Sequence, residues 1–294
     1  MRISIITPTS QNIEPLISVF ESKGVTVDKN KLHPECDAII GTGQVGVHLV
    51  ELFHKTLPEI PLINLTLDFY KTVWTAPNPH GYNWQLYKDV LIEADELWCL
   101  SNEVILRMKE EGININKCRM MKIWARFFEY AGEVKDGRYI LNPVRPYLYD
   151  KNHGWLEQAC EELEIPLVRP NHRLSEEEFK RNIAECSFMC CEYHEASTGG
   201  LTLLEGLRLG KVSVVSDSPY CGARDYLGEH AIYFNDNSYE DFKQVIKNTW
   251  ENTPTIDKKE REEFCAAHPS MDDMATRMIN RLTILTKGKN CNES

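Results

Sequence analysis

The residues from Ser197 to Ser216, STGGLTLLEGLRLGKVSVVS, have the types and the order of a phosphate-binding turn. Gly199 and Gly200 end a loop, a short helical run follows, and Gly210 closes that helix before a β-branched strand. Such a helix directs free backbone N–H groups and the positive end of its dipole at one point, which suits a phosphate. Glu205 lies about one turn further in, where a carboxylate can accept hydrogen bonds from a ribose. An ordinary loop–helix–strand unit of an α/β domain explains this pattern equally well.

A second glycine-rich turn lies nearer the N-terminus. Gly41, Gly43 and Gly46 follow an apolar strand and open a helical run, and the next strand ends at Asp68. This order approaches the dinucleotide-binding fingerprint, in which the acidic residue binds a ribose, and it favours an NAD-dependent oxidoreductase as a competing function. Asp68 comes late for that motif, which here follows the second strand. The same turn suits an acceptor-facing loop that includes Gly43 and Gln44.

A loop over residues 78–84, NPHGYNW, brings a histidine and an indole to the same end of the expected sheet. Aromatic faces and amide side chains bind sugars through apolar contact and directed hydrogen bonds. His80 is therefore the first choice for a catalytic-pocket residue of the N-terminal half, and Trp84 for the acceptor side. A hydrogen-bonded loop histidine without a catalytic role is the competing interpretation.

The bulk composition narrows the class of protein. The net charge of −11 disfavours a nucleic-acid partner, since a phosphate backbone binds a basic face. No apolar run approaches the roughly 20 residues of a membrane span. The sequence also lacks Cys-x-x-Cys and Asp-x-Asp pairs, so we expect no metal site. Cys190 and Cys191 lie in an apolar run, where thiols act as small hydrophobic groups, and a reducing cytoplasm fits best.

Strand-like and helical runs alternate along the whole chain, which predicts parallel sheets with helices on both faces. A polar break with two glycines at residues 132–137 interrupts the alternation. The expected strands cover residues 3–6, 37–40, 62–67, 96–100, 139–142, 166–169, 188–191, 212–215 and 231–234. The expected helices cover residues 12–23, 47–55, 84–93, 104–111, 153–163, 175–186, 239–250 and 271–285, and Ser175 with Glu178 forms a capping box.

An ordered set of motifs in the C-terminal half resembles the donor half of the large retaining GT-B glycosyltransferase family (the group 1, family 4-like enzymes). The set consists of YILNPVR ending at Arg145, Lys151, LSEEEF at 174–179, GLTLLEG at 200–206 and GKVSVV at 210–215. It covers about residues 137–235, and it is specific as an ordered set but weak in any single part. The N-terminal half matches the family only in its alternation of strands and helices.

The resemblance implies a role for each matching residue. Arg145 and Lys151 would neutralise the diphosphate of a nucleotide sugar, which gains negative charge as it leaves. The amides of Leu201 and Thr202 would contact the phosphates, and Glu205 would hold the ribose. Other expected donor contacts are Arg173, Glu195, Ser197, Gly199 and Gly200. Taken singly, Arg145 also fits a surface ion pair and Lys151 a turn.

One position departs from the family pattern. The E-x7-E motif that ends at Glu205 should begin with a glutamate at position 197, where this chain has Ser197. That glutamate faces the transferred sugar in the family. Either Ser197 contacts the sugar through its hydroxyl, or Glu195, two residues earlier, takes the place, or the sugar is recognised differently.

These observations predict an α/β protein with two doubly wound, Rossmann-like domains that face a cleft, the GT-B fold. Residues 1–132 would bind the acceptor through Gly43, Gln44, Asp68 and Trp84, residues 133–270 would bind the nucleotide sugar, and a helix over 271–294 would cross back to the N-terminal domain. We expect a metal-independent hexosyltransferase without a cofactor, acting on a glycan, lipid-linked or protein acceptor, with a peripheral membrane contact left open. The alternatives are the oxidoreductase and a non-catalytic nucleotide- or glycan-binding module.

Overall fold

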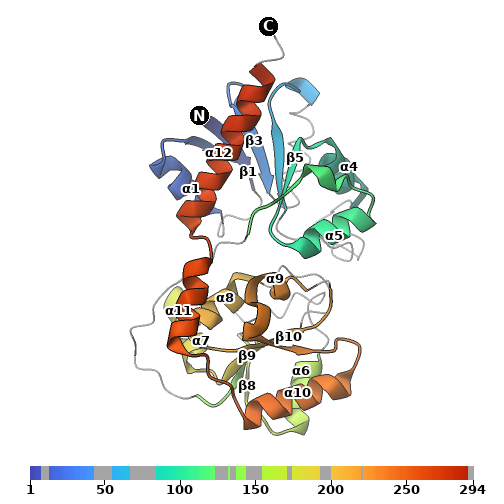
Figure 1. The fold of residues 1–294 in the computed structure, drawn as a ribbon, viewed down its shortest axis with the longest axis vertical. Helices are drawn as coiled ribbons and strands as arrows, with labels where there is room; N and C mark the ends of the chain where they lie inside the picture. The colour runs from blue at the N-terminus through green and yellow to red at the C-terminus, as the bar shows by residue number, and fades with distance from the viewer. Residues whose placement is uncertain are drawn as a thin grey trace. The chain divides into compact units, whose positions relative to one another are not determined.

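A computed structural model describes residues 1–7, 13–42, 55–66, 84–122, 132, 137–143, 154–170, 174–192, 200–219 and 221–290 (Figure 1). The chain divides into two compact units. The first domain combines Met1–Trp124 with Pro269–Ser294, and the second domain is Ala125–His268. The C-terminal segment therefore belongs to the same unit as the N-terminus.

The first domain contains a six-stranded parallel sheet in the order β2-β1-β3-β4-β5-β6. Its strands are β1 (Arg2–Ile6), β2 (Thr26–Lys29), β3 (Ala38–Thr42), β4 (Leu62–Thr66), β5 (Glu96–Cys99) and β6 (Cys118–Met120). Its helices are α1 (Glu14–Ser22), α4 (Trp84–Glu93), α5 (Asn102–Glu110), the 3₁₀ turn η1 (Ile115–Lys117) and α12 (Met271–Asn290).

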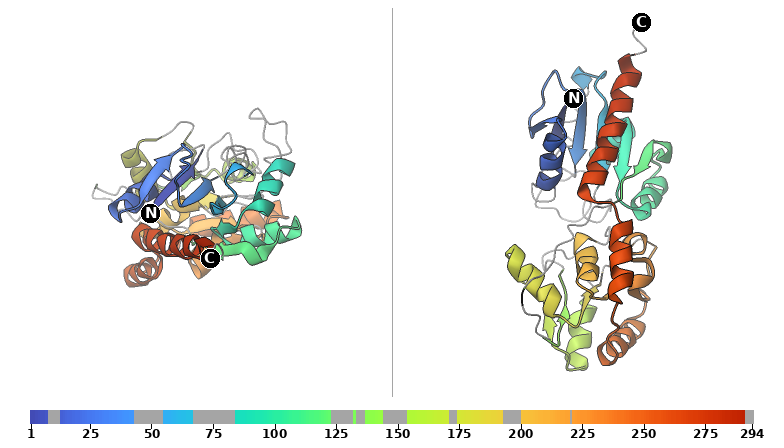
Figure 2. Two further views of the ribbon diagram at one scale, coloured as in Figure 1. Left: turned by 90° about the horizontal axis from the view of Figure 1, so that it is seen from above. Right: turned by 60° about the vertical axis from the view of Figure 1, so that its left-hand side comes forward.

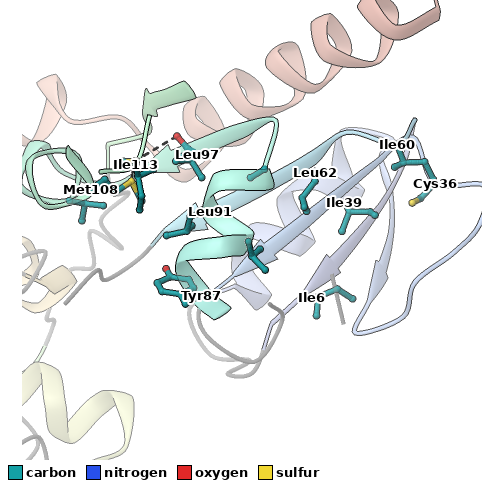
Figure 3. Packing of buried hydrophobic residues seen from close by; sticks show 14 residues of the cluster. Ile6, Cys36, Ile39, Ile60, Leu62, Tyr87, Leu91, Leu97, Met108 and Ile113 are labelled. Carbon is teal, nitrogen blue, oxygen red and sulfur yellow. Dashed lines mark hydrogen bonds between the residues drawn. The ribbon is translucent and has the colours of Figure 1, made fainter. Parts of the chain in front are cut away.

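Helices cover both faces of this sheet, and its central strands β3, β4 and β5 are therefore buried on both sides. On one face, Leu62 and Leu97 pack against Tyr87 and Leu91 of α4 and Met108 of α5 (Figure 3). The opposite side chains of the strands turn toward α1 and α12. They are Ile5, Ile40, Leu65 and Trp98, and together with Phe20 and Met278 they line one small internal cavity.

The last helix, α12, packs on the first domain along α1 (Figure 1, Figure 2). Met274, Met278 and Leu282 repeat at helical spacing and are fully buried. Polar contacts lie on both sides of this buried stripe. Lys23, the residue after α1, pairs with Asp272 at 2.8 Å, and Arg281 pairs with Glu96 of β5. The apolar face of α12 therefore packs against elements from the start of the chain.

The second domain contains a five-stranded parallel sheet in the order β11-β10-β9-β7-β8. Its strands are β7 (Ile140–Leu141), β8 (Leu167–Val168), β9 (Phe188–Cys191), β10 (Ser213–Ser216) and β11 (Ala231–Phe234). Its helices are α6 (Trp155–Glu162), α7 (Glu176–Glu185), α8 (Gly200–Arg208), α9 (Ala223–Leu227), α10 (Tyr239–Glu251) and α11 (Lys258–Ala267), with a 3₁₀ turn η3 (Gly228–His230).

Alternate side chains of β9 face opposite layers of helices. Phe188 and Cys190 join a core cluster with Leu156 of α6 and Phe242 of α10. Met189 points the other way, toward Gly206 of α8, where a Cβ atom would lie 1.8 Å from the Met189 Cε. Glycine at 206 therefore lets α8 approach the sheet closely.

All nine predicted strands are present, with ends that differ from the predicted ones by at most two residues. The capping box at Ser175 and Glu178 is confirmed, as is the closing role of Gly210, which has a φ of 79°. Two edge strands, β2 and β6, and two helices, α9 and α11, were not predicted. Most of the helix expected at 47–55 lies outside the described residues.

Candidate functional site

Both sheets reverse their strand order beside their first strand, and such a reversal creates the usual binding crevice of a doubly wound domain. In the second domain the reversal lies between β7 and β9, which pair directly and lead into α6 and α8. Asn142 follows β7 and Glu192 follows β9, and both are fully buried at the carboxyl ends of their strands. The carboxyl edge of this sheet is therefore the candidate site.

Helix α8 presents the predicted phosphate-binding residues on its first two turns. It begins at Gly200, continues through Leu201 and Thr202, and buries Glu205 to 2% exposure. A carboxylate is rarely buried to this extent unless it has a specific partner or task. The structure thus brings together the described part of the predicted motif on one helix.

The C-terminus of α8 is locked in a Schellman motif. The N–H of Lys211 donates to the carbonyl of Gly206 at 2.9 Å, and the N–H of Gly210 donates to the carbonyl of Leu207 at 2.9 Å. Gly210 adopts the left-handed conformation that this motif requires. The motif fixes where α8 ends and where β10 begins.

A charged network that the sequence analysis missed lies at the same edge. The Oε2 atom of Glu192 accepts a hydrogen bond from the N–H of Leu156 in the first turn of α6, at 2.9 Å. The Oε1 atom of Glu192 accepts another from Arg169 Nη2 at 3.2 Å, and Arg169 also pairs with Glu157. The one signal in the sequence was an acidic residue placed directly after the buried strand FMCC.

Electrostatics distinguish α6 from α8 at this edge. Burial raises the pKa of Glu192, although the N–H of Leu156 and the charge of Arg169 pull it down. The first turn of α6 thus already binds a protein carboxylate. An added anion at that turn would meet like charge, so α8 is the more suitable helix for a phosphate.

Two predicted residues of the first domain have described positions. Trp84 is the first residue of α4, and its ring lies 6.3 Å from that of Tyr87 while it packs against the apolar cluster. Gly41 lies inside β3 rather than after it, because it pairs with Ile6 of β1 and Asn64 of β4. The strand therefore continues two residues further than the sequence indicated.

The remaining predicted site residues lie outside the described part of the chain. They are Gly43, Gln44, Asp68, His80, Arg145, Lys151, Arg173, Glu195, Ser197 and Gly199. Within the described residues, no group of three or more His, Cys, Asp or Glu side chains could hold a metal ion. The same residues include no helix that is long and apolar enough to cross a membrane.

Comparison with known proteins gives structural but not sequence matches. No family model and no curated protein sequence matches the chain. The sucrose-phosphate synthase of Thermosynechococcus elongatus has a similar structure, with a TM-score of 0.79, 10% identity, and coverage of 98% of this chain and 100% of that one. HepE of Anabaena in complex with UDP and glucose matches with a TM-score of 0.63, 11% identity and 98% of both chains.

A third solved structure, the lipopolysaccharide outer core galactosyltransferase WaaB in its apo form, matches with a TM-score of 0.65 and 10% identity over 97% of this chain and 99% of that one. This chain has the GT-B fold. The two doubly wound domains that the sequence predicted are therefore confirmed, and the resemblance to GT-B glycosyltransferases holds at the level of the fold.

Proposed function

We propose that this chain is a glycosyltransferase that moves a sugar from a nucleoside diphosphate sugar to a hydroxyl group of an acceptor. The observation that carries the proposal is the buried Glu205 on α8, one turn inside a helix that begins with glycine beside the switch point of the second sheet. The likeness to HepE, which was solved in complexes with UDP and with UDP-glucose, supports a nucleotide sugar as the donor.

The chemistry requires groups that stabilise the leaving diphosphate. The amides of Leu201 and Thr202 at the start of α8 would donate to its phosphates, and Arg145 and Lys151 would supply positive charge. Glu205 would bridge the two ribose hydroxyls. The transition state would resemble an oxocarbenium ion, as in other glycosyl transfer.

Retention of the anomeric configuration and independence from metal are parts of this proposal. Retention follows from the resemblance of the donor motifs. In that mechanism the leaving phosphate itself takes the proton of the acceptor. Fixed cations and helix amides would neutralise the charge of the leaving diphosphate, which a metal ion does in enzymes with an Asp-x-Asp motif. Activity should therefore persist in excess EDTA, and a loss restored by Mn²⁺ or Mg²⁺ would contradict this mechanism.

The acceptor would bind the first domain. His80, Gly43, Gln44, Asp68 and Trp84 are the residues proposed for that side, and a glycan, a lipid-linked sugar or a protein would provide the hydroxyl group. Every cysteine within the described residues is a free thiol, which supports a reducing compartment such as the cytoplasm.

A ligand panel tests the function directly. Thermal shifts would be measured with UDP-, GDP- and ADP-sugars, the free diphosphates, NAD⁺ and NADH. A ligand at 100 times its Kd stabilises the folded protein by about 2.7 kcal/mol, so a specific donor stands out. Stabilisation by a nucleotide sugar followed by its turnover supports the proposal. Stabilisation by NADH alone would favour the oxidoreductase, and nucleotide binding without turnover would favour the binding module.

A further inference from the structure

Glu192 joins three separate segments at the carboxyl edge of the second sheet. It is the first residue after β9, where the chain leaves for α8, and it is fully buried. Its two carboxylate oxygens have different partners, the N–H of Leu156 at 2.9 Å and Arg169 Nη2 at 3.2 Å. Leu156 belongs to the first turn of α6, and Arg169 is the residue after β8.

The contact supplies helix α6 with a side-chain acceptor that its own N-cap residue, a glycine, does not carry. Its N-cap residue is Gly154, with a φ of 73° and no side-chain hydrogen bond. The carboxylate of Glu192 therefore acts as an N-terminal capping group for α6 from a different part of the chain. Arg169 completes the arrangement by pairing with both Glu192 and Glu157, which lies in the same first turn.

Stability alone is a weak reason for such an arrangement. A buried carboxylate and guanidinium lose hydration that their attraction barely returns, and well-packed apolar residues are often equally stable. The network instead fixes directions, since hydrogen bonds to a carboxylate hold both partners in defined orientations. The groups held in this way belong to the first turn of α6 and to the carboxyl ends of β8 and β9, which lie beside the switch point.

We propose that Glu192 is a positioning residue of the donor site, which holds the first turn of α6 and Arg169 against the carboxyl end of β9. This inference rests on the proposed function, because it assumes that the diphosphate binds at this edge. Glu192 does not touch the donor, since it is fully buried and both of its oxygens are engaged by the protein.

The test compares Glu192→Ala and Glu192→Gln with two control variants. Glu96→Gln removes a buried, arginine-paired carboxylate from the first domain, and Glu162→Gln removes an ion pair with Lys243 at the opposite end of α6. The ligands are UDP, GDP and ADP, of which the tightest binder of the wild type is used, together with its parent nucleoside. Titration calorimetry follows the diphosphate, ligand-observed NMR follows the nucleoside, and thermal unfolding reports stability.

We expect Glu192→Ala to weaken diphosphate binding about ten- to a hundredfold, as misplacement by a remote change can, while nucleoside binding stays the same. Glu192→Gln should be affected less, because its amide oxygen can still accept the N–H of Leu156. If Glu192→Ala does not fold, Glu192→Gln alone decides, with a measurable loss of diphosphate affinity at constant nucleoside affinity. Both controls should bind like the wild type at temperatures well below their melting points.

Two results would overturn the positioning role of Glu192, and a third would overturn the proposed function as well. Folded Glu192 variants that bind the diphosphate like the wild type would show that the network positions nothing. Equal losses for diphosphate and nucleoside would show that Glu192 only maintains the domain. A wild type that binds none of the diphosphates would remove the proposed function, and the positioning role with it.

Discussion

Glu205 is the described residue on which the proposed donor site should depend most. Its carboxylate is buried on α8, one turn from the amides proposed for the phosphates. Glu205→Gln keeps the size of the side chain and removes its charge. It should weaken binding of the free nucleoside diphosphate and of the nucleotide sugar equally, by about 1.5–3 kcal/mol, the usual worth of a hydrogen bond to a charged group. Titration calorimetry with both ligands measures this.

Ser197→Ala is the matched comparison, because position 197 faces the transferred sugar in the family that the motif resembles. It should leave the free diphosphate unaffected and weaken only the nucleotide sugar. A misfolded variant would lose both ligands, so the difference between them is informative. Equal losses for Ser197→Ala, or no loss for Glu205→Gln, would mean that the motif has been aligned wrongly.

We expect Glu192 to make the stability of the second domain depend on pH. Burial raises its pKa, so the folded domain holds this proton more tightly than the unfolded chain does. Its contribution to stability is complete below the ordinary glutamate pKa of about 4.3 and is lost as pH rises through the raised value. The unfolding free energy of the wild type minus that of Glu192→Gln should therefore fall as pH rises above about 4.3.

Urea denaturation at a series of pH values measures this difference. The charged and thiol groups around Glu192, which are Arg169, Glu157, Cys160 and Cys190, are the same in both proteins, so the comparison isolates the carboxyl group of Glu192. A difference that grows with pH would mean that the charge of Arg169 outweighs burial.

The sequence singles out Glu205 as a candidate and gives little sign of Glu192, for a physical reason. The motif around Glu205 is local: two glycines, a helical run, a closing glycine and a strand follow one another within 20 residues. Glu192 contacts Leu156 and Arg169, which lie 36 and 23 residues away along the chain. Such contacts arise only when parallel strands bring their carboxyl ends together.

Among the elements, the C-terminal end of helix α8 is set by the left-handed backbone conformation of one residue, Gly210. Gly210 has a φ of 79°, which costs a residue with a Cβ atom about 1–2 kcal/mol. An added Cβ would also lie 2.6 Å from Arg261 Nη1, a flexible group that can move away. Gly210→Ala should therefore lower the unfolding free energy of the protein by about 1–2 kcal/mol in urea denaturation.

Gly210→Asn is the control for this prediction, since asparagine tolerates the left-handed conformation better than alanine. It should be the more stable of the two variants. Equal stability of Gly210→Ala and the wild type would show that the closing turn relaxes without strain.

The elements that the sequence failed to predict are short, polar or at an edge. The edge strands β2, TVDK, and β6, CRM, lack the continuous apolar run that marks the buried strands. Helix α11, KKEREEFCAA, is mostly charged and buries Cys265 alone, so its hydrophobic period is weak. Helix α9 has five residues, too few for a period to show. The buried central strands were found because both of their faces are apolar.

At the scale of the whole molecule, the fold is retained at very low sequence identity. The sucrose-phosphate synthase superposes over nearly the entire chain at 10% identity. Parallel strands need only apolar runs of the right length, and helices need only an apolar stripe, so many sequences satisfy the same architecture. The fold therefore says little about the acceptor, which depends on individual loop residues.

The C-terminal helix is tied to the first domain by a buried carboxylate. Glu96 of β5, 3% exposed, accepts hydrogen bonds from Arg281 Nε at 2.8 Å and from Trp98 Nε1 at 3.1 Å, and Arg119 lies 3.3 Å away. Burial alone would raise the pKa of Glu96, but the hydrogen bonds from Arg281 and Trp98 and the nearby charges outweigh it and lower the pKa. The ionised form is thus the one that holds α12.

Glu96→Gln should lower the unfolding free energy by about 2–4 kcal/mol, because it leaves two arginines beside a neutral group. Asp272→Asn, which removes the exposed ion pair with Lys23 from the same helix, should change stability little.

Since the pKa of Glu96 is lowered on folding, the contribution of Glu96 to stability is complete above about pH 4.3 and is lost as pH falls through the lowered value. The difference between wild type and Glu96→Gln in urea denaturation should therefore shrink as pH drops below about 4.3, the opposite direction to Glu192. A difference independent of pH would mean that the Glu96→Gln variant has lost packing rather than charge, and that α12 is held by its apolar face alone.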